Sequence, residues 1–555
     1  MKSYLTPFLS EALTAICSPF GAEVPSEITL EIPRNAEHGD LSTNVAMTLA
    51  KALKKNPREI ATSLVESLKS RVDATIVTDI SIAGAGFINF TFAKDFYGKR
   101  LSAVIAEGAK YGENKQGSGV KANVEYVSAN PTGLLHVGHG RNAAIGDTIA
   151  NILVWNGYDV TREYYFNNAG NQMNNLGRSV HLRYLQHFDA NVEFSEEDKG
   201  LYHGEYIKDI AQTLVVKHGE VLKEPNEANL TTCRKAAEEW CFATIRATMK
   251  RMNIHHDVYF NEDSLYTDGK VNDTIEHLRD KGVVYEKDGA TWLALSKMGM
   301  TDDRVIIKSS GEPTYRLPDI AYHHDKLSRR KFDLVVDIFG ADHIATIPDV
   351  MAAVETLGED KSKVRVVIHQ FVTLMKDGEQ VKMSKRTGRS YTLDDLMEEF
   401  GEDVTRFFFI MRGVSTHLEF DLNLAEEQSE KNPVFYLQYA HARIASVLRT
   451  AEERGVTIAA TANTALLLHP SEIDLIKLVL RFPEIVSRAA ETLEPQGIAE
   501  FLRDVAAAFH KFYHDCRILG EADDIMQARF ALLNAAKTVL KNGLSILGIS
   551  APEKM

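Results

Sequence analysis

Between about residues 120 and 400, the hydrophobic pattern switches repeatedly between strand-like and helical spacing. Residues 121–127 (KANVEYV) alternate polar and apolar positions, which is typical of a strand with one buried face. From Gly140 onward, helical spacing returns, and Gly157 provides a C-terminal stop. The apolar positions of this helix are Ile145, Ile149, Ile152 and Leu153. The stretch therefore predicts a strand, a turn containing glycine and proline, and a helix.

Two nearly continuous apolar runs, at 333–339 (DLVVDIF) and 364–368 (VRVVI), predict further strands. Such runs are expected in a parallel sheet that helices cover on both faces. The first run ends in a turn at 340–343 (GADH), and open parallel sheets bind ligands at the carboxyl ends of their strands. We expect an α/β, Rossmann-like domain over 120–400, with a short insertion at about 185–255.

The two ends of the chain show other patterns. Residues 1–110 mix helical spacing with strand-like runs at 28–32 and 80–92, which predicts an α+β domain, and 108–119 (GAKYGENKQGSG) is expected to be a flexible linker. Within 401–555 the strand signals fade and long helical stripes predict an all-α bundle. One of these helices is expected to begin with Asn432 as its N-cap and Pro433 at its first position.

Composition places the 555-residue chain among ordinary globular proteins of roughly three or four domains. No run of about 18 apolar residues predicts a membrane span. The four cysteines are scattered without a CxxC pair, which disfavours a disulfide framework or a structural zinc site and favours the cytoplasm. These cysteines are Cys17, Cys233, Cys241 and Cys516.

The net charge of −14 argues at first against a nucleic-acid partner, but phosphate contacts need only local basic patches. Three basic clusters stand at 51–58 (KALKKNPR), 326–331 (KLSRRK) and 382–389 (KMSKRTGR). Taken singly, we interpret each cluster as a solvated face. The histidine pairs 255–256 and 323–324 match no metal-ligand spacing, and we interpret them as ordinary surface or core residues.

The strongest chemical signal is His136-Val137-Gly138-His139, where the predicted helix opens. A helix start presents free N–H groups and the positive end of its dipole, which suits anions. Two imidazoles three residues apart share one helix face and can donate hydrogen bonds to phosphate oxygens, while Gly138 leaves room for a flat base. A metal pair is the main alternative, but no third ligand stands close in sequence. The pattern predicts a nucleoside triphosphate site.

A second motif lies about 245 residues downstream, at 382–389. A short loop with several lysines can close over a triphosphate and neutralise the charge that develops on a leaving pyrophosphate. The two motifs together resemble the HIGH and KMSKS signatures of the class I aminoacyl-tRNA synthetases.

The closer resemblance is to the arginyl-tRNA synthetase family, and it extends over essentially the whole chain. It rests on segments such as HGDLSTNVAMTLAK (38–51), VEYVSANPTGLLHVGHGRNAAIGD (124–147), GEPTYRLPDIAY (311–322) and NPVFYLQYAHAR (432–443). The resemblance implies ATP-dependent activation of L-arginine to arginyl-adenylate and transfer to tRNA(Arg). It also implies an appended tRNA-recognition domain over 1–110, and a connecting segment with an anticodon-binding domain over 401–555.

The site residues follow from the same resemblance. Residues implied to bind ATP are His136, Gly138, His139, Gly340, His343, Lys382, Met383, Ser384 and Lys385, of which His136, His139 and Lys385 take part in catalysis. Residues implied to bind arginine are Glu125, Ser128, Asn130, Glu262, Tyr315 and Asp319. Mg²⁺ is expected to arrive with ATP rather than in a protein cage. We expect a monomer without a membrane partner.

Some points stay open at the level of sequence. Arg386 replaces the last serine of the KMSKS consensus, Arg389 stands where related sequences often carry asparagine, and the role of Asp342 beside His343 is unassigned. Two other functions compete with the resemblance: a small-molecule nucleotidyltransferase, which would leave the C-terminal helices without a task, and a tRNA-binding regulator, which would require lost catalytic residues.

Overall fold

The structure, a computed structural model, describes residues 2–25, 28–33, 35–194, 200–382 and 391–555. It contains two compact units, each made of separated stretches of the chain. The first unit comprises Met1–Gly108, Leu448–Leu480 and Ala508–Ala536. The second comprises Ala109–Val447, Arg481–Ala507 and Lys537–Met555.

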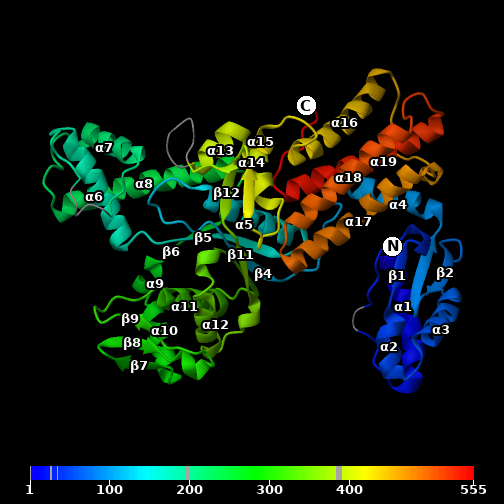
Figure 1. Cartoon of the computed structure of the whole chain (residues 1–555), viewed down its shortest axis with the longest axis horizontal. Helices are drawn as coiled ribbons and strands as arrows, with labels where there is room; N and C mark the ends of the chain where they lie inside the picture. Colours follow the sequence, from blue (N-terminus) through cyan, green and yellow to red (C-terminus); the bar gives the residue numbers. More distant parts are fainter. Residues whose placement is uncertain (1, 26–27, 34, 195–199, 383–390) are drawn as a thin grey trace. The chain divides into compact units, whose positions relative to one another are not determined.

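A five-stranded parallel sheet forms the centre of the second unit (Figure 1). Its strands lie in the order β11-β10-β4-β5-β6. Their bounds are β4 Lys121–Glu125, β5 Asp159–Phe166, β6 Val258–Asn261, β10 Leu334–Gly340 and β11 Val364–His369. Because the chain runs outward in both directions from β4 and β10, the switch point of the sheet lies between these two strands. The predicted α/β Rossmann-like fold is confirmed.

Strand β4 is two residues shorter than the alternating pattern predicts. Val127 and Ser128 have φ angles of 68° and 43°, in the left-handed region that β-branched residues rarely adopt. This backbone turns the chain away from the sheet before α5 (Val137–Trp155), which packs on β4, β5 and β10. The predicted helix and its stop near Gly157 are confirmed.

One face of the sheet region carries a mixed subdomain with its own hydrophobic core. The core joins α10, α11, α12 and a three-stranded antiparallel sheet, β7-β8-β9, and includes Leu278, Leu293 and Leu317. Its elements are α9 Asp263–Thr267, α10 Lys270–Asp280, β7 Val284–Lys287, β8 Ala290–Leu293, β9 Arg304–Ile307, α11 Arg316–His324 and α12 Ile347–Thr356. Figure 1 shows them grouped together in green.

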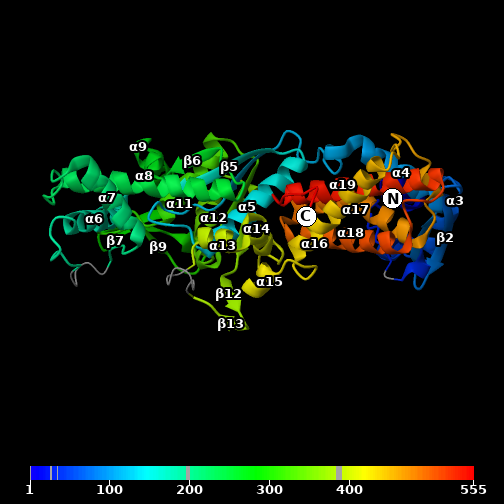
Figure 2. The same cartoon turned by 90° about the horizontal axis from the view of Figure 1, so that it is seen from above.

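Three helices between β5 and β6 form a separate cluster of the second unit. They are α6 Gly170–Gln186, α7 Glu205–His218 and α8 Glu227–Arg251. Their core includes Leu176, Ile210 and the buried thiols of Cys233 and Cys241. In both Figure 1 and Figure 2 the three helices lie side by side.

A second small sheet follows β11. Strand β12 (Val372–Lys376) pairs with β13 (Glu379–Gln380) in a hairpin and runs parallel to β14 (Leu418–Asp421). Figure 2 shows the hairpin beside α15 (Leu422–Glu426). Helices α13 (Leu393–Phe400) and α14 (Glu402–Ile410) lie between the strands in sequence.

The N-terminal stretch of the first unit is α+β, as predicted, but its strands differ from the expected runs. Residues 80–92 form a hairpin of β2 (Val77–Ala83) and β3 (Phe87–Phe92), and β1 (Leu41–Thr43) pairs with β3. Near 28–32, the described residues form only a bridge from Glu31 to Ser42. The helices are α1 Lys2–Cys17, α2 Val45–Leu53, α3 Pro57–Lys69 and α4 Lys94–Glu107.

Long helices dominate the C-terminal part, as predicted. They are α16 Pro433–Glu453, α17 Pro470–Thr492, α18 Gln496–Asp515 and α19 Asp523–Ile546. Asn432 caps α16 by accepting a hydrogen bond from the Val434 N–H (3.1 Å). Within the first unit, the stretch 448–480 contributes Lys477, whose Nζ lies 2.5 Å from the Asp40 carboxylate. The N-terminal stretch therefore shares one compact unit with C-terminal helical segments.

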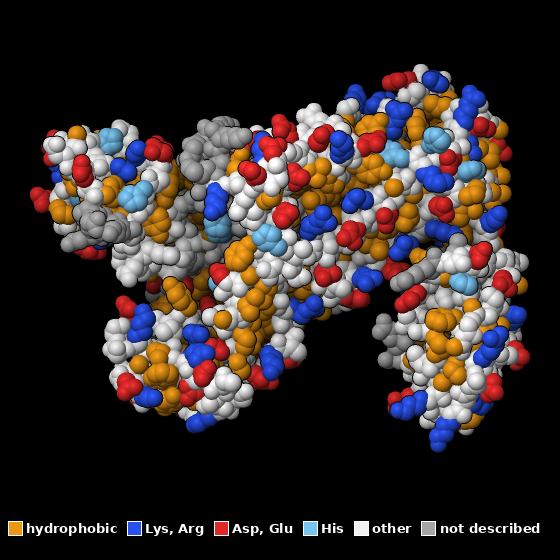
Figure 3. All heavy atoms as spheres, in the orientation of Figure 1, with side chains coloured by type: hydrophobic (Ala, Val, Ile, Leu, Met, Phe, Trp, Pro, Cys, Tyr) orange, Lys and Arg blue, Asp and Glu red, His pale blue; other side chains and the backbone are white. Residues whose placement is uncertain are grey.

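The linker prediction for 108–119 needs correction, because part of it is held by hydrogen bonds. The Asn114 N–H donates to the Trp155 carbonyl (3.0 Å) and the Gly117 N–H to the Asn156 carbonyl (2.8 Å). The interpretation of 326–331 as a solvated face is wrong for Lys326, which is fully buried. Elsewhere, Lys and Arg are interspersed with Asp and Glu on the face drawn in Figure 3.

Candidate active site

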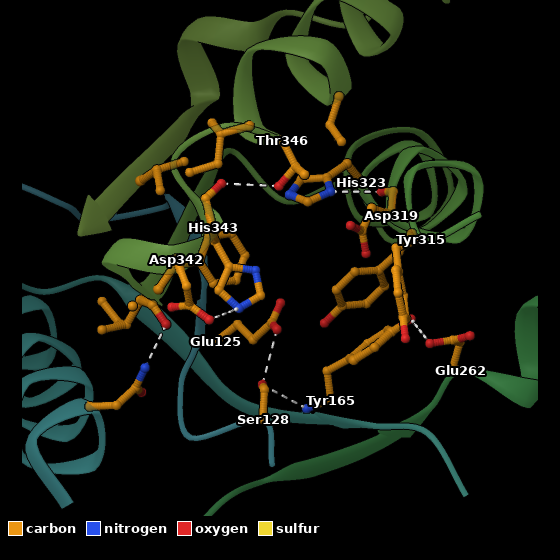
Figure 4. A pocket seen from close by; sticks show the side chains of 18 of the residues that line it. Glu125, Ser128, Tyr165, Glu262, Tyr315, Asp319, His323, Asp342, His343 and Thr346 are labelled. Carbon is orange, nitrogen blue, oxygen red and sulfur yellow. Dashed lines mark hydrogen bonds and ion pairs between the residues drawn. The ribbon is translucent and has the colours of Figure 1, made fainter. Parts of the chain in front are cut away.

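A cavity of about 440 Å³ opens at the carboxyl ends of β4 and β10, the switch point of the sheet (Figure 4). All six residues implied to bind arginine line it, together with Gly340 and His343. Asp342 also lines it, and Figure 4 shows it beside His343. The structure thus gathers side chains from positions 125 to 366 around one space.

The strained turn after β4 forms one wall of the cavity. Asn142 on α5 accepts a hydrogen bond from the Val127 N–H (2.6 Å) and donates to the Ile338 carbonyl (2.8 Å). Ser128 Oγ donates to Glu125 Oε1 (3.0 Å) and accepts from the Tyr165 N–H (3.2 Å). A left-handed conformation at such residues costs about 1–3 kcal/mol each and is typical of functional sites. The surrounding hydrogen bonds hold Ser128 toward the cavity.

Three of the residues implied to bind arginine are carboxylates that face this space, each with different partners. Glu262 accepts hydrogen bonds from the Tyr165 hydroxyl and from Asn167 (both 2.8 Å), and burial raises its pKa. Glu125 accepts from Lys326 Nζ (2.7 Å). The half-buried Asp319 carboxylate receives no hydrogen bond from the described side chains or backbone. The site therefore retains acceptor capacity for a ligand with several donors.

Asp319 is the most perturbed of these carboxylates. Burial and the negative charges of Glu125 and Glu262 raise the pKa of Asp319 to about 7. A cation bound between the carboxylates would relieve this repulsion and favour the ionised form. A planar guanidinium, with five donors and a permanent charge, matches such a group of acceptors.

Tyr315 and Asn130 lie at the cavity as predicted from the sequence. Tyr315 immediately precedes α11, one turn before Asp319, and its side chain is 82% exposed at the rim. Asn130 accepts a hydrogen bond from the Asn167 N–H (3.0 Å) and donates to Gln172 (2.9 Å). Tyr315 is therefore free of the core and available to cover a ligand.

The two signature histidines cap helix α5 in a reciprocal arrangement. His136 Nδ1 accepts from the N–H groups of Gly138 (3.1 Å) and His139 (3.4 Å), and His139 Nδ1 accepts from the His136 N–H (3.3 Å). Their rings stack 3.7 Å apart. A Cβ on residue 138 would lie only 3.0 Å from His136 Cε1, so glycine leaves room for the stacked rings.

This arrangement fixes where the imidazole protons lie. Burial lowers the pKa of both rings, to about 3 for His139, which also lies near His136 and His369. A neutral imidazole that accepts at Nδ1 carries its proton on Nε2. Both histidines therefore present an Nε2–H donor beside the positive end of α5, which suits phosphate oxygens.

The second signature lies largely outside the described residues. This holds for Met383, Ser384, Lys385, Arg386 and Arg389, while Lys382 is described and exposed. The chain that follows is tied to the first signature: the Leu393 N–H donates to the Leu135 carbonyl (2.8 Å), and Thr392 forms a β-bridge with His136. His136, Gly138, His139 and Lys382 do not line the 440 Å³ cavity, which α5 borders through Asn142.

Several lining residues were missed by the sequence analysis. Tyr165 and Asn167, near the end of β5, support Glu262, and Tyr322 and His323 lie on α11. The sequence could have indicated Tyr322 and His323, because they stand three and four residues after Asp319 and therefore share its helix face.

The histidine-capped helix, the carboxylate-lined cavity and the parallel sheet define a class I aminoacyl-tRNA synthetase, and residues 100–408 match the family described as "tRNA synthetases class I (R), catalytic domain". Residues 5–92 match "Arginyl tRNA synthetase N terminal domain", and residues 437–555 match "DALR anticodon binding domain". The chain belongs to the arginyl-tRNA synthetase family.

Relatives and solved structures agree with this family. Arginine–tRNA ligases of Salinibacter ruber and Chlorobaculum tepidum are 51% and 47% identical, each over the full length of both chains. A putative arginyl-tRNA synthetase structure from Campylobacter jejuni has a TM-score of 0.77 at 34% identity, covering 84% of this chain and all of that one. The Thermus thermophilus arginyl-tRNA synthetase, at 22% identity, shares the fold over both full chains with a TM-score of 0.77.

No helix among the described residues has both the length and the apolar composition needed to cross a membrane.

Proposed function

We propose that this chain is an arginine–tRNA ligase that works in two steps. The carboxylate of L-arginine attacks the α-phosphorus of ATP, the bond to the β-phosphate oxygen breaks, and pyrophosphate leaves. The 3′-terminal ribose hydroxyl of tRNA(Arg) then attacks the carbonyl carbon of arginyl-adenylate, and AMP leaves. The observation that carries the proposal is the cavity at the switch point, which gathers the carboxylates of Glu125, Glu262 and Asp319 and is bordered through Asn142 by α5, the helix that the two signature histidines cap.

Recognition of arginine is assigned to the two ends of this cavity. Asp319 and Glu262 would accept hydrogen bonds from the guanidinium, and Tyr315 would cover it at the rim. Ser128 and Asn130, near Glu125, would hold the α-amino and carboxylate end. Positioning of these two ends, rather than covalent catalysis, would supply much of the rate.

ATP would bind with its phosphates at the start of α5. The Nε2–H groups of His136 and His139 would stabilise the charge that develops during adenylate formation. From the sequence motif, Lys382 and Lys385 would neutralise the leaving pyrophosphate. Gly340 and His343, at the end of β10, would contact the nucleotide from the other side.

Mg²⁺ would arrive bound to ATP. Among the described residues, no group of three or more His, Cys, Asp or Glu side chains could hold a metal ion. Mg²⁺ usually binds through substrate phosphates and one or two carboxylates rather than in an all-protein cage, so we expect it to be held mainly by ATP. When bound, it would add positive charge at the phosphates. Action as a monomer and a cytoplasmic location are likewise proposed from the sequence.

The N-terminal stretch would recognise tRNA through a second cavity, of about 480 Å³, in the first unit. Its lining includes Ile32 and Phe87, which are 46% and 42% exposed, beside the buried Asn89. An exposed aromatic ring next to polar side chains is typical of a site that stacks and hydrogen-bonds an unpaired base.

Phe87→Ala is expected to raise the KM for tRNA(Arg) about ten-fold, because stacking of one base contributes ~1–3 kcal/mol. The KM for arginine should not change. Phe20→Ala is the matched control, since Phe20 is an exposed phenylalanine (51%) of the same unit outside this cavity. Aminoacylation at varied tRNA concentration measures both variants, and equal KM values for the two would contradict the assignment.

The overall function is tested by AMP formation from ATP by the purified full-length chain. We expect AMP release that requires both arginine and tRNA(Arg). AMP transfer to a small molecule without tRNA would favour a nucleotidyltransferase. Tight tRNA binding with no turnover would favour a regulator.

A further inference from the structure

Lys326 is a fully buried charge directly behind the amino-acid cavity. It lies on a π-helical turn after α11 (Asp325–Arg329), and none of its side-chain surface is exposed. Its Nζ donates to Glu125 Oε2 (2.7 Å) and to Asp337 Oδ1 (2.8 Å), and lies 4.1 Å from the centre of the Tyr322 ring. Burying an ammonium group is costly unless it is fully paired, and buried ion pairs add little net stability. A role beyond stability is therefore worth testing.

The two carboxylates that Lys326 joins are neighbours in the sheet. Glu125 on β4 is in register with Asp337 on β10, and both side chains are almost completely buried. Although burial alone would raise the pKa of Asp337, Lys326 and His323 hold it below its usual range. Lys326 thus bridges two adjacent buried carboxylates, one of which faces the cavity.

His323, on α11, also contacts Asp337. Its Nε2 contacts Asp337 Oδ2 (2.9 Å), and its Nδ1 contacts the Asp319 carbonyl (2.8 Å). A carbonyl and an ionised carboxylate both accept hydrogen bonds, so both ring nitrogens must donate and the ring is an imidazolium. Burial opposes this charge, but Asp337 raises the pKa of His323. Figure 4 shows the contact between His323 and the backbone of Asp319.

We propose that Lys326, Asp337 and His323 form a positioning unit that sets both ends of the arginine cavity. Lys326 holds Glu125 in the orientation in which it also accepts a hydrogen bond from Ser128, at the end that takes the α-amino and carboxylate groups. His323 holds the first turn of α11, which carries Asp319, at the guanidinium end. The inference rests on the proposed function, because it concerns how that same cavity selects arginine.

Loss of the lysine would remove the cation that holds Glu125 beside the cavity. The groups that face Lys326 are Glu125 on β4, Glu163 on β5, Asp337 on β10, and Tyr322 and His323 on α11. Arg330 and Tyr322 already bond to Glu163. Without Lys326, the buried carboxylates of Glu125 and Asp337 would lie on neighbouring strands with no cation between them, and Glu125 would lose the contact that holds it in place beside the cavity.

Lys326→Met is therefore expected to raise the KM for arginine about ten-fold at pH 7, with little change in the KM for ATP. The change should appear in the KM for arginine and leave kcat near the parent's. Aminoacylation and direct titration of arginine measure these values. A merely structural lysine would lower stability and kcat and leave the affinity for arginine unchanged.

A double-mutant cycle tests whether Lys326 acts on arginine binding through Glu125. Glu125→Gln should raise the arginine KM in the parent but should add little in Lys326→Met, where Glu125 has already lost the contact that holds it in place. Additive effects would overturn the proposal. Arg529→Met is the matched control, because it removes a cation from a buried ion pair with Glu472 (2.8 Å) in the other compact unit. It should lower stability without changing the KM for arginine.

His323→Gln tests the guanidinium end of the arginine cavity. It also provides a test of the proposal if Lys326→Met does not fold. The glutamine keeps a donor toward Asp337 but lacks the ring Nδ1–H that bonds to the Asp319 carbonyl. Arginine affinity should fall while the KM for ATP stays near the parent's, and unchanged arginine affinity would overturn the proposal. If the parent itself fails to charge tRNA with arginine, the proposed function fails; if the parent charges tRNA but the variants bind arginine as it does, only this inference fails.

Discussion

Asp319→Asn is expected to raise the KM for arginine by about 10- to 150-fold, because charge-assisted hydrogen bonds contribute about 1.5–3 kcal/mol. The asparagine keeps the size of the side chain, but it removes the charge and turns amide donors toward guanidinium donors. The KM for ATP should change little, since the phosphates are assigned to His136 and His139. Discrimination against lysine and canavanine should shrink as well. Aminoacylation at varied arginine and ATP concentrations measures these values.

The raised pKa of Asp319 predicts that the KM of the parent for arginine depends on pH. The pKa of Asp319 is raised to about 7 in the cavity without ligand, and arginine requires the ionised form. Below pH 7 a proton must leave before arginine binds, so the KM should rise about ten-fold for each pH unit lost. Above pH 7 it should level off. In Asp319→Asn this dependence should disappear.

Glu262→Gln is the companion variant, because Glu262 is held by Tyr165 and Asn167 on the same side of the cavity. It should also weaken arginine binding. If both Asp319→Asn and Glu262→Gln bind arginine as tightly as the parent, the pocket has been placed on the wrong residues.

His139→Asn is expected to lower kcat by about 10²-fold or more, the usual loss when one donor to a developing negative charge is removed. Asparagine can place an oxygen near the position of Nδ1, where it still accepts from the His136 N–H, but it lacks the Nε2–H donor. His139→Gln offers the opposite change, with a donor near Nε2 and no acceptor at Nδ1.

Comparison of the two variants separates helix capping from catalysis. We expect His139→Gln to retain more of kcat than His139→Asn, with thermal unfolding used to follow the loss of the cap. Single-turnover adenylate formation with tRNA present gives the rate of the chemical step. A larger loss of kcat in His139→Gln than in His139→Asn would mean that His139 acts through the cap rather than as a donor to phosphate.

Local sequence patterns predicted the elements that short-range spacing determines. The strand before the first signature, helix α5 and the Asn432 cap of α16 were all predicted, because each depends on residues within a few positions. The left-handed backbone at Val127 and Ser128 was not, because neither residue type favours it and the hydrogen bonds that hold it come from α5 and β5.

The residues of the site were predicted mainly through the family resemblance. The buried charged residues behind the cavity were not predicted. Lys326 stands in a basic cluster typical of a solvated face, and one of its partners, Glu125, lies 201 residues away in sequence. Only the pairing of β4 with β10 brings Glu125 and Asp337 together behind the cavity. Likewise, local periodicity gave no indication that Met1–Gly108 shares a compact unit with Leu448–Leu480 and Ala508–Ala536.

The central claim is that a carboxylate-lined cavity selects a guanidinium, and citrulline tests it most directly. Citrulline has nearly the shape of arginine, but its neutral urea group places an oxygen where arginine has a donor. The measurement is kcat/KM for tRNA-dependent AMP formation with each amino acid, using the full-length chain. We predict a preference for arginine of about 10⁴-fold or more, because a site built for hydrogen-bond donors leaves its acceptors unpaired with the analogue. Comparable kcat/KM values for the two amino acids would contradict the account.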